Sequence, residues 1–199
     1  MPYYFKITHT KGRFSRIGCD TLAQTTMAGY HGTIENKAKS ILDTQRFYIS
    51  KKPTEWLGTG SYFFQHPTHA EIWANRESRK EHNQGQKPVV LEVSLTCDKS
   101  QIFDLDDPEN LYALNDFIKS FFKKLGSERY VEFKALKDTE KWCLCCNLYR
   151  QTHPDIAITK YTFADPKKQG FSGFRTTQTQ LCVSKEKQDI ITSIKEWKA

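Results

Sequence analysis

The segment YHGTIENKAKSILDTQRFYISKKPTEWLGTGSYFF, from Tyr30 to Phe64, decides the fold that this sequence predicts. Residues 28–33 and 60–64 have the short, aromatic and β-branched composition of strands. Between them, the apolar residues of segment 35–46 recur at helical spacing, with Thr33 or a neighbouring residue available as the N-cap. The segment therefore predicts a strand, a helix and a second strand.

The rest of the chain continues this alternation of short strands and helices. We expect further strands at residues 3–7, 47–50, 89–95, 156–161, 180–183 and 190–197, and helices from Pro67 to about Arg79, at 110–125 and near 140–150. A loop is expected over residues 163–177. This order predicts an α+β fold with two packed, mainly antiparallel sheets and flanking helices, formed by a single domain over residues 1–199.

Composition indicates a globular protein with a basic surface. Of the 199 residues, 38% are hydrophobic and 27% charged, and no apolar run approaches the ~20 residues of a membrane span. The first 18 residues lack the apolar region of a secretory signal, so we expect a cytoplasmic protein with no membrane partner. The net charge of +7 favours polyanions, nucleic acid above all, although solvated surface lysines give the same charge.

Six cysteines are expected to be free thiols, mostly buried and apolar. A zinc site built from Cys143, Cys145, Cys146 and His153 is the alternative. Its C-x-C-C spacing lacks the two-residue turn of a zinc knuckle, and no second knuckle follows. We therefore expect no metal.

His31 and Tyr62 are each accompanied by glycine, and together they suggest a ligand site. A glycine after His31 leaves its own amide and carbonyl accessible to a planar amide such as nicotinamide. Gly58 and Gly60 clear space before Tyr62, whose ring can stack on a heterocycle. A lone histidine or strand tyrosine is more often structural, so only the combination is specific.

The pattern is carried by His31-Gly32-Thr33, Lys37-Ala38, Ile41-Leu42, Phe47, Trp56-Leu57-Gly58, Gly60, Tyr62-Phe63-Phe64, Ala70 and Trp73-Ala74. It resembles the NAD-binding half of the ADP-ribosyltransferases of the histidine-tyrosine-glutamate class, which includes diphtheria toxin and the poly-ADP-ribose polymerases. The strong part of the resemblance covers residues 31–74. It implies an ADP-ribosyltransferase-like fold that uses NAD as substrate, bound in the cleft between the two sheets.

The resemblance also assigns roles to residues of this half. It implies that His31 holds the adenosine-side ribose hydroxyl, that Gly32 pairs with the nicotinamide carboxamide, and that Tyr62 stacks on the nicotinamide ring. Trp73 would supply the second wall of the ring site. Ser50 or Thr33 would contribute a hydroxyl nearby.

The third signature residue of the family is a glutamate at the start of a late strand. The best match here is TQTQLCV, which places Gln180 in the glutamate position. A glutamine accepts a hydroxyl hydrogen bond but lacks the charge that stabilises a developing cation, so transfer of a single ADP-ribose is expected rather than polymerisation. Glu132 is the second candidate for this role.

The loop before Gln180 is where this family reads its acceptor. Here Phe171, Phe174 and Arg175 mix exposed rings with cations, which suits single-stranded nucleic acid, and Gln178 lies on the same strand face as Gln180. RNA or a single-stranded DNA base is therefore the expected acceptor, with a protein side chain as the alternative. Phe171 and Phe174 could instead simply hold the loop.

A compact basic transferase of this kind resembles the toxins of bacterial toxin-antitoxin and antiphage defence systems. That comparison implies an effector that modifies RNA or another macromolecule, and an antitoxin protein as partner. Two further alternatives remain, an NAD glycohydrolase that transfers ADP-ribose to water and a non-catalytic RNA-binding descendant of the fold.

Overall fold

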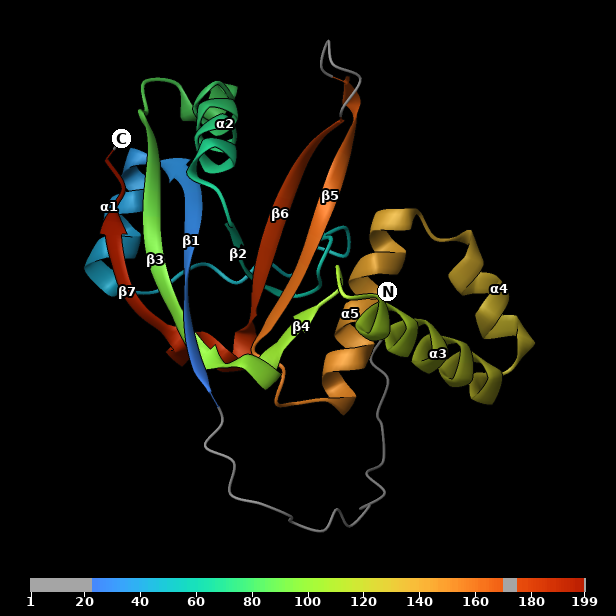
Figure 1. The fold of residues 1–199 in the computed structure, drawn as a ribbon. Helices are drawn as coiled ribbons and strands as arrows, with labels where there is room; N and C mark the ends of the chain where they lie inside the picture. The colour runs from blue at the N-terminus through green and yellow to red at the C-terminus, as the bar shows by residue number, and fades with distance from the viewer. Residues whose placement is uncertain (1–22, 170–174, 199) are drawn as a thin grey trace.

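A seven-stranded mixed sheet forms the centre of the computed structural model, which describes residues 23–169 and 175–198 (Figure 1). The strand order is β4-β5-β6-β2-β1-β3-β7. All neighbouring pairs are antiparallel except β4 with β5. The strands are β1 (Gln24–Ile34), β2 (Gly60–Phe64), β3 (Pro88–Asp98), β4 (Ile102–Asp104), β5 (Ile158–Gln169), β6 (Arg175–Ser184) and β7 (Ile191–Glu196).

Two halves of this sheet are joined by very little pairing. β1 pairs with β3 along its whole length, from Gln24 opposite Asp98 to Ile34 opposite Pro88. Its pairing with β2 is confined to Tyr30 opposite Phe64, and the strands diverge beyond it (Figure 1). The predicted α+β class is confirmed, whereas the predicted two packed sheets are wrong, because a residual bridge keeps the halves in one hydrogen-bonded sheet.

The first two helices cover opposite faces of β1 and β3. α1 (Glu35–Thr44) buries Ala38 and Ile41 against Leu91 and Phe63. α2 (Pro67–Ser78) packs the small residues Ala70 and Ala74 against Val90 on the other face. α1 ends at Gln45, which adopts a left-handed backbone with φ of 54°.

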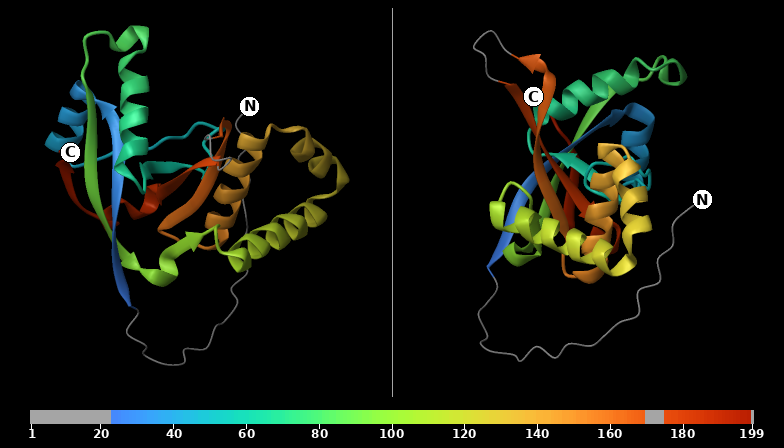
Figure 2. Two further views of the ribbon diagram at one scale, coloured as in Figure 1. Left: turned by 45° about the horizontal axis from the view of Figure 1, so that its top comes forward. Right: turned by 90° about the vertical axis from the view of Figure 1, so that its right-hand side faces the viewer.

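The remaining α-helices gather beside the β4, β5 and β6 half of the sheet (Figure 2). They are α3 (Pro108–Leu125), α4 (Ser127–Ala135) and α5 (Asp138–Thr152). Leu114, Ile118 and Phe122 of α3 are buried in a core with α5, as the apolar stripe predicts. α4 buries no residue completely, so its sequence does not have the strong apolar periodicity that predicts a helix.

Element prediction fails chiefly where strands are short or unusually long. The predicted strand over 47–50 is wrong, since only Ser50 forms a bridge, with Gly60. The predicted loop over 163–177 is also wrong, because β5 extends to Gln169 and β6 begins at Arg175. The expected strand over 3–7 lies outside the described residues. In the described part of the chain, no helix combines the length and apolarity that crossing a bilayer requires.

Candidate functional site

The edge of β1 that faces β2 is open at Gly32. Glu35 N donates to Lys87 O at 3.0 Å, so odd-numbered residues of β1 direct their backbone groups toward β3. Gly32 therefore directs its N–H and C=O toward β2. The register at Tyr30 and Phe64 would place Gly32 opposite Tyr62, but the strands are not paired there. Both backbone groups of Gly32 thus face the side of β1 without a paired strand.

The His31 side chain occupies the point where β1 and β2 separate. His31 Nδ1 lies 2.9 Å from Tyr62 O. A carbonyl can only accept, so Nδ1 carries the proton and Nε2 presents an acceptor lone pair. If β1 and β2 continued to pair, Tyr62 O would accept a hydrogen bond from Gly32 N–H. The His31 imidazole takes the place of that donor. Edge-to-face contacts with Phe47 and Phe63, at centroid distances of 5.1 and 6.0 Å, fix the ring.

Burial lowers the pKa of His31 below its usual 6.5, and the nearby charge of Lys37 acts in the same direction. The hydrogen bond to Tyr62 O opposes this shift without cancelling it. His31 is therefore neutral at pH 7, as an acceptor at Nε2 requires. Among the described residues, no hydrogen-bond partner of Nε2 is present, which leaves that lone pair for a hydroxyl donor.

Packing alone requires a glycine at position 32, whether or not a ligand binds there. A Cβ built there would lie 2.0 Å from Ala70 O and 2.9 Å from Ala70 C. The backbone of α2 therefore approaches β1 too closely for any other residue. The predicted accessible backbone is compatible with this contact, because the Cβ direction points to α2 whereas the N–H and C=O point along the sheet.

Tyr62 is held by its hydroxyl. Its Oη donates to Gly58 O at 2.6 Å and accepts from Leu57 N at 2.9 Å. Burial raises the pKa of Tyr62 far above its usual value, so the hydroxyl stays protonated. The ring is half-buried against the core that contains Cys182. The loop before β2 thus fixes the ring at one end.

Two side chains of α5 clamp that same loop. Thr59 N donates to Asn147 Oδ1 at 2.8 Å, and Arg150 Nη2 donates to Thr59 O at 2.9 Å. Arg150 Nη2 also donates to Asn147 Oδ1 at 2.9 Å. Gly58 has φ of +86°, and a Cβ there would lie 2.3 Å from Arg150 Nη2. Asn147 and Arg150 were not predicted, because their only signal in the sequence is their spacing of three within an otherwise cysteine-rich helix.

The other residues predicted for this half are placed unevenly. Trp73 lies on α2, 43% exposed, and the centroid of its ring is 6.4 Å from that of Phe64. Ser50 Oγ donates to the carboxylate of Glu55, which was not among the predicted site residues. Thr33 is buried, and its neighbour Ile34 takes the N-cap position of α1, without a side-chain hydrogen bond.

Gln180 and Glu132 differ clearly in position. Phe64 pairs with Gln180 and Tyr62 with Cys182, so all four side chains share one face of the sheet. Gln180 therefore lies on the Tyr62 face. Glu132 is on α4, at the far edge of the helical group, ion-paired to Arg129 at 2.9 Å with 49% of its side chain exposed (Figure 1). The structure does not bring Glu132 to the site.

Two of the predicted acceptor residues, Arg175 and Gln178, lie on β6. Gln178 is paired with Phe163 and shares the face of Gln180, while Arg175 is exposed where β6 begins. Phe163 packs on Trp56 at 4.5 Å. Phe171 and Phe174 fall outside the described residues.

The cysteines behave as expected where they are described. Cys97, Cys143, Cys146 and Cys182 are buried free thiols, and Cys145 is half-buried. Burial raises the pKa of Cys143 and of Cys145 to about 11. His153, at the end of α5, stacks on Tyr149 at 4.0 Å. Within residues 23–169 and 175–198, no group of three metal-ligating side chains comes together.

Comparison with known proteins adds one relative. The chain is 27% identical over 117 residues to the uncharacterized protein MJ0359 of Methanocaldococcus jannaschii. The match covers 56% of this chain and 55% of that protein, so the chain spans about half the length of this relative. No protein-family model matches, and no solved structure matches.

Proposed function

We propose that this protein is an NAD-dependent mono-ADP-ribosyltransferase, and that its acceptor is single-stranded nucleic acid. The observation that carries the proposal is the open edge of β1, where Gly32 N–H and C=O face away from β3 beside a neutral His31. An amide donor and a carbonyl acceptor in this arrangement match the two hydrogen-bonding groups of a carboxamide. The lone pair of His31 Nε2, on the preceding residue of β1, matches a ribose hydroxyl.

In the proposed reaction, the bond between the ribose C1′ and the nicotinamide nitrogen breaks, and its electron pair leaves with nicotinamide. Tyr62, held by its hydroxyl, would present its ring to the pyridinium. Gln180, on the Tyr62 face, would accept a ribose hydroxyl through its amide oxygen as positive charge develops. A nucleophilic nitrogen or oxygen of the acceptor then bonds to C1′ and loses its proton.

The neutral amide of Gln180 limits this chemistry. A charged acceptor bonds about twice as strongly as a neutral one, so Gln180 stabilises the cation less than a glutamate would. We therefore propose transfer of one ADP-ribose unit. A nucleic-acid acceptor is supported by the net charge of +7 and by the exposed Arg175 at the start of β6.

Incubation of the protein with isotopically labelled NAD and total cell extract tests the proposal. We expect a macromolecular label that nuclease removes and protease does not. His31→Ala and Tyr62→Ala should abolish labelling while remaining folded, whereas the control Tyr112→Ala, at a 67% exposed tyrosine of α3, should label normally. Normal labelling by both site variants would refute the proposal.

The same assay separates the rival functions. Protease-sensitive label would assign a protein acceptor, and nicotinamide release without any label would assign a glycohydrolase. RNA binding without nicotinamide release would assign a non-catalytic module. A toxin role, with an antitoxin partner in the cytoplasm, predicts that expression arrests growth and that His31→Ala relieves the arrest.

A further inference from the structure

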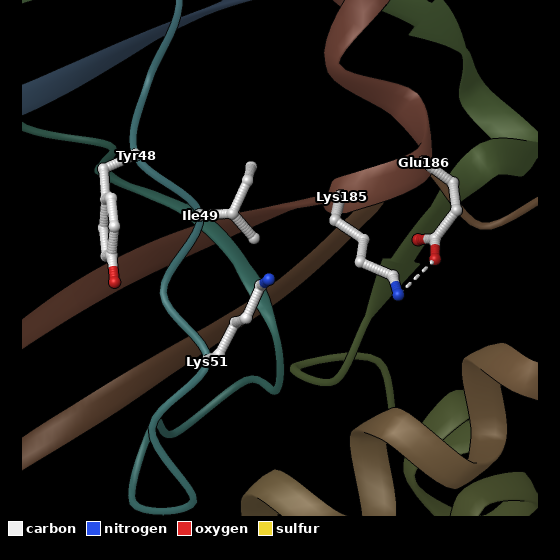
Figure 3. Close-up of a pocket in the computed structure, with 5 residues that line it drawn as sticks. All are labelled: Tyr48, Ile49, Lys51, Lys185 and Glu186. Atoms are coloured by element: carbon white, nitrogen blue, oxygen red, sulfur yellow. Dashed lines mark ion pairs between the residues drawn. The ribbon is translucent and has the colours of Figure 1, made fainter.

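A cationic pocket lies near the N-terminal end of β2, which begins at Gly60. It has a volume of about 540 Å³ and is lined by Tyr48, Ile49, Lys51, Lys185 and Glu186 (Figure 3). This volume lies within the range of pockets that hold small organic groups. None of these residues belongs to the set predicted for the dinucleotide.

Gly60 brings the two walls of the pocket together. It bridges Ser50 on one side and pairs with Ser184 on the other. Residues 48–51, which follow α1, are thus fixed opposite Lys185 and Glu186 at the start of η3 (Lys185–Ile190). Figure 3 shows Lys51 and Lys185 coming from these two segments. The pocket is therefore built on strand pairing rather than on one mobile loop.

The lining combines an exposed ring with two ammonium groups. Tyr48 is 84% exposed, which leaves both ring faces open to stacking. Of the five described residues that line the pocket, Glu186 is the only acid, and it pairs with Lys185 at 3.2 Å. Ser184 Oγ also donates to Glu186 at 2.8 Å. Exposed ion pairs of this kind contribute little to stability, so Lys185 can exchange Glu186 for a phosphate.

We propose that this pocket binds one nucleotide of a single-stranded nucleic acid, with the base on Tyr48 and the phosphate between Lys51 and Lys185. The inference rests on the proposed function, for which it supplies part of the acceptor surface. A free dinucleotide fits the pocket less well. Small-molecule sites enclose most of their ligand, whereas Tyr48 is almost fully open and suits a strand that passes across it.

Binding of a fluorescent single-stranded RNA of ten nucleotides, followed by anisotropy with the full chain and without NAD, tests the pocket. We expect Tyr48→Ala to raise the Kd about tenfold, or about 1.4 kcal/mol. The double variant Lys51→Ala with Lys185→Ala should reduce the slope of log K against log salt by about 0.7, the value for one phosphate of a single strand.

The matched controls are Tyr112→Ala and the pair Lys119→Ala with Lys123→Ala, all at exposed positions of α3. They should bind as the parent protein does. Equal affinity for Tyr48→Ala and the parent, equal losses in the controls, or one-to-one competition by NAD would overturn the proposal. The affinities of the parent and the variants are measured without NAD, which is added only in the competition experiment. Failure of the pocket is therefore distinguishable from failure of the transferase, which is measured separately as nicotinamide release.

Discussion

The two edges of β1 have opposite characters. Toward β3, the strand is paired continuously from Gln24 to Ile34. Toward β2, its pairing is confined to Tyr30 and Phe64, and the His31 imidazole bonds Tyr62 O in place of further ladder. The first edge therefore holds the strand in position while the second leaves hydrogen-bonding groups for something other than protein. One strand can therefore be continuously paired along one edge and open along the other.

The largest loss of stability is expected from adding a side chain at Gly32, where β1 and α2 approach each other. Gly32→Ala places a Cβ 2.0 Å from Ala70 O, and backbone cannot move aside cheaply. We expect a loss of more than ~4 kcal/mol in the free energy of unfolding, or no folded protein. The control Gly85→Ala has φ of +82° but nothing within 4 Å, so it should cost about 1 kcal/mol. Equal losses in urea denaturation would refute the close approach.

A smaller effect is expected from freeing the Tyr62 ring. Tyr62→Phe removes the bonds to Gly58 O and from Leu57 N, leaving Leu57 N–H without its partner. We expect a loss of about 1–3 kcal/mol by denaturation, with the ring itself preserved. Affinity for a non-reactive NAD analogue should change less than in Tyr62→Ala. If both variants lose the same affinity, the hydroxyl rather than the ring supports binding.

His31, at the point where β1 and β2 separate, should make the stability of the protein depend on pH. Its pKa is lowered in the folded protein, so between that value and about 6.5 the unfolded chain binds more protons. The contribution of His31 to the free energy of unfolding is fully present above about pH 6.5 and is lost as the pH falls through the lowered pKa. We expect His31→Asn to flatten this part of the curve in denaturation measured from pH 7 to pH 5. An unchanged slope in that variant would assign the dependence to other groups.

The smallest effect is expected far from β1. Glu132→Ala removes an exposed ion pair with Arg129 and should change stability by no more than about 1 kcal/mol. Nicotinamide release should be unaffected, whereas Gln180→Ala should lose most of it. Loss of turnover in Glu132→Ala would restore it as a candidate for the third role.

Local patterns predicted the elements that bury a regular face. The helices that became α1, α2 and α3 were predicted to within a few residues, because small and apolar side chains recur where each helix meets the core. α4 was missed because it buries no residue completely. The length of the β5–β6 hairpin was missed because polar residues such as Thr162 and Thr177 pair in a strand without an apolar pattern.

The site could be predicted only in part. Glycine beside His31 and Tyr62 is a local signal, and the structure explains Gly32 by the approach of α2 and Gly58 by its left-handed backbone. Asn147 and Arg150 act from α5, about ninety positions away in sequence, through bonds to Thr59. Contacts at such separation depend on the fold, and no single segment encodes them.

Hydrogen exchange of the β1 amides, followed by NMR, tests the open edge most directly. In the free protein, Gly32 N–H should exchange fast while Thr33 N–H, which faces β3, exchanges slowly. Addition of a non-reactive NAD analogue should slow exchange at Gly32 and leave Thr33 unchanged. Gly32 protected as strongly as Thr33 without ligand, or unaltered by the analogue, would contradict the account.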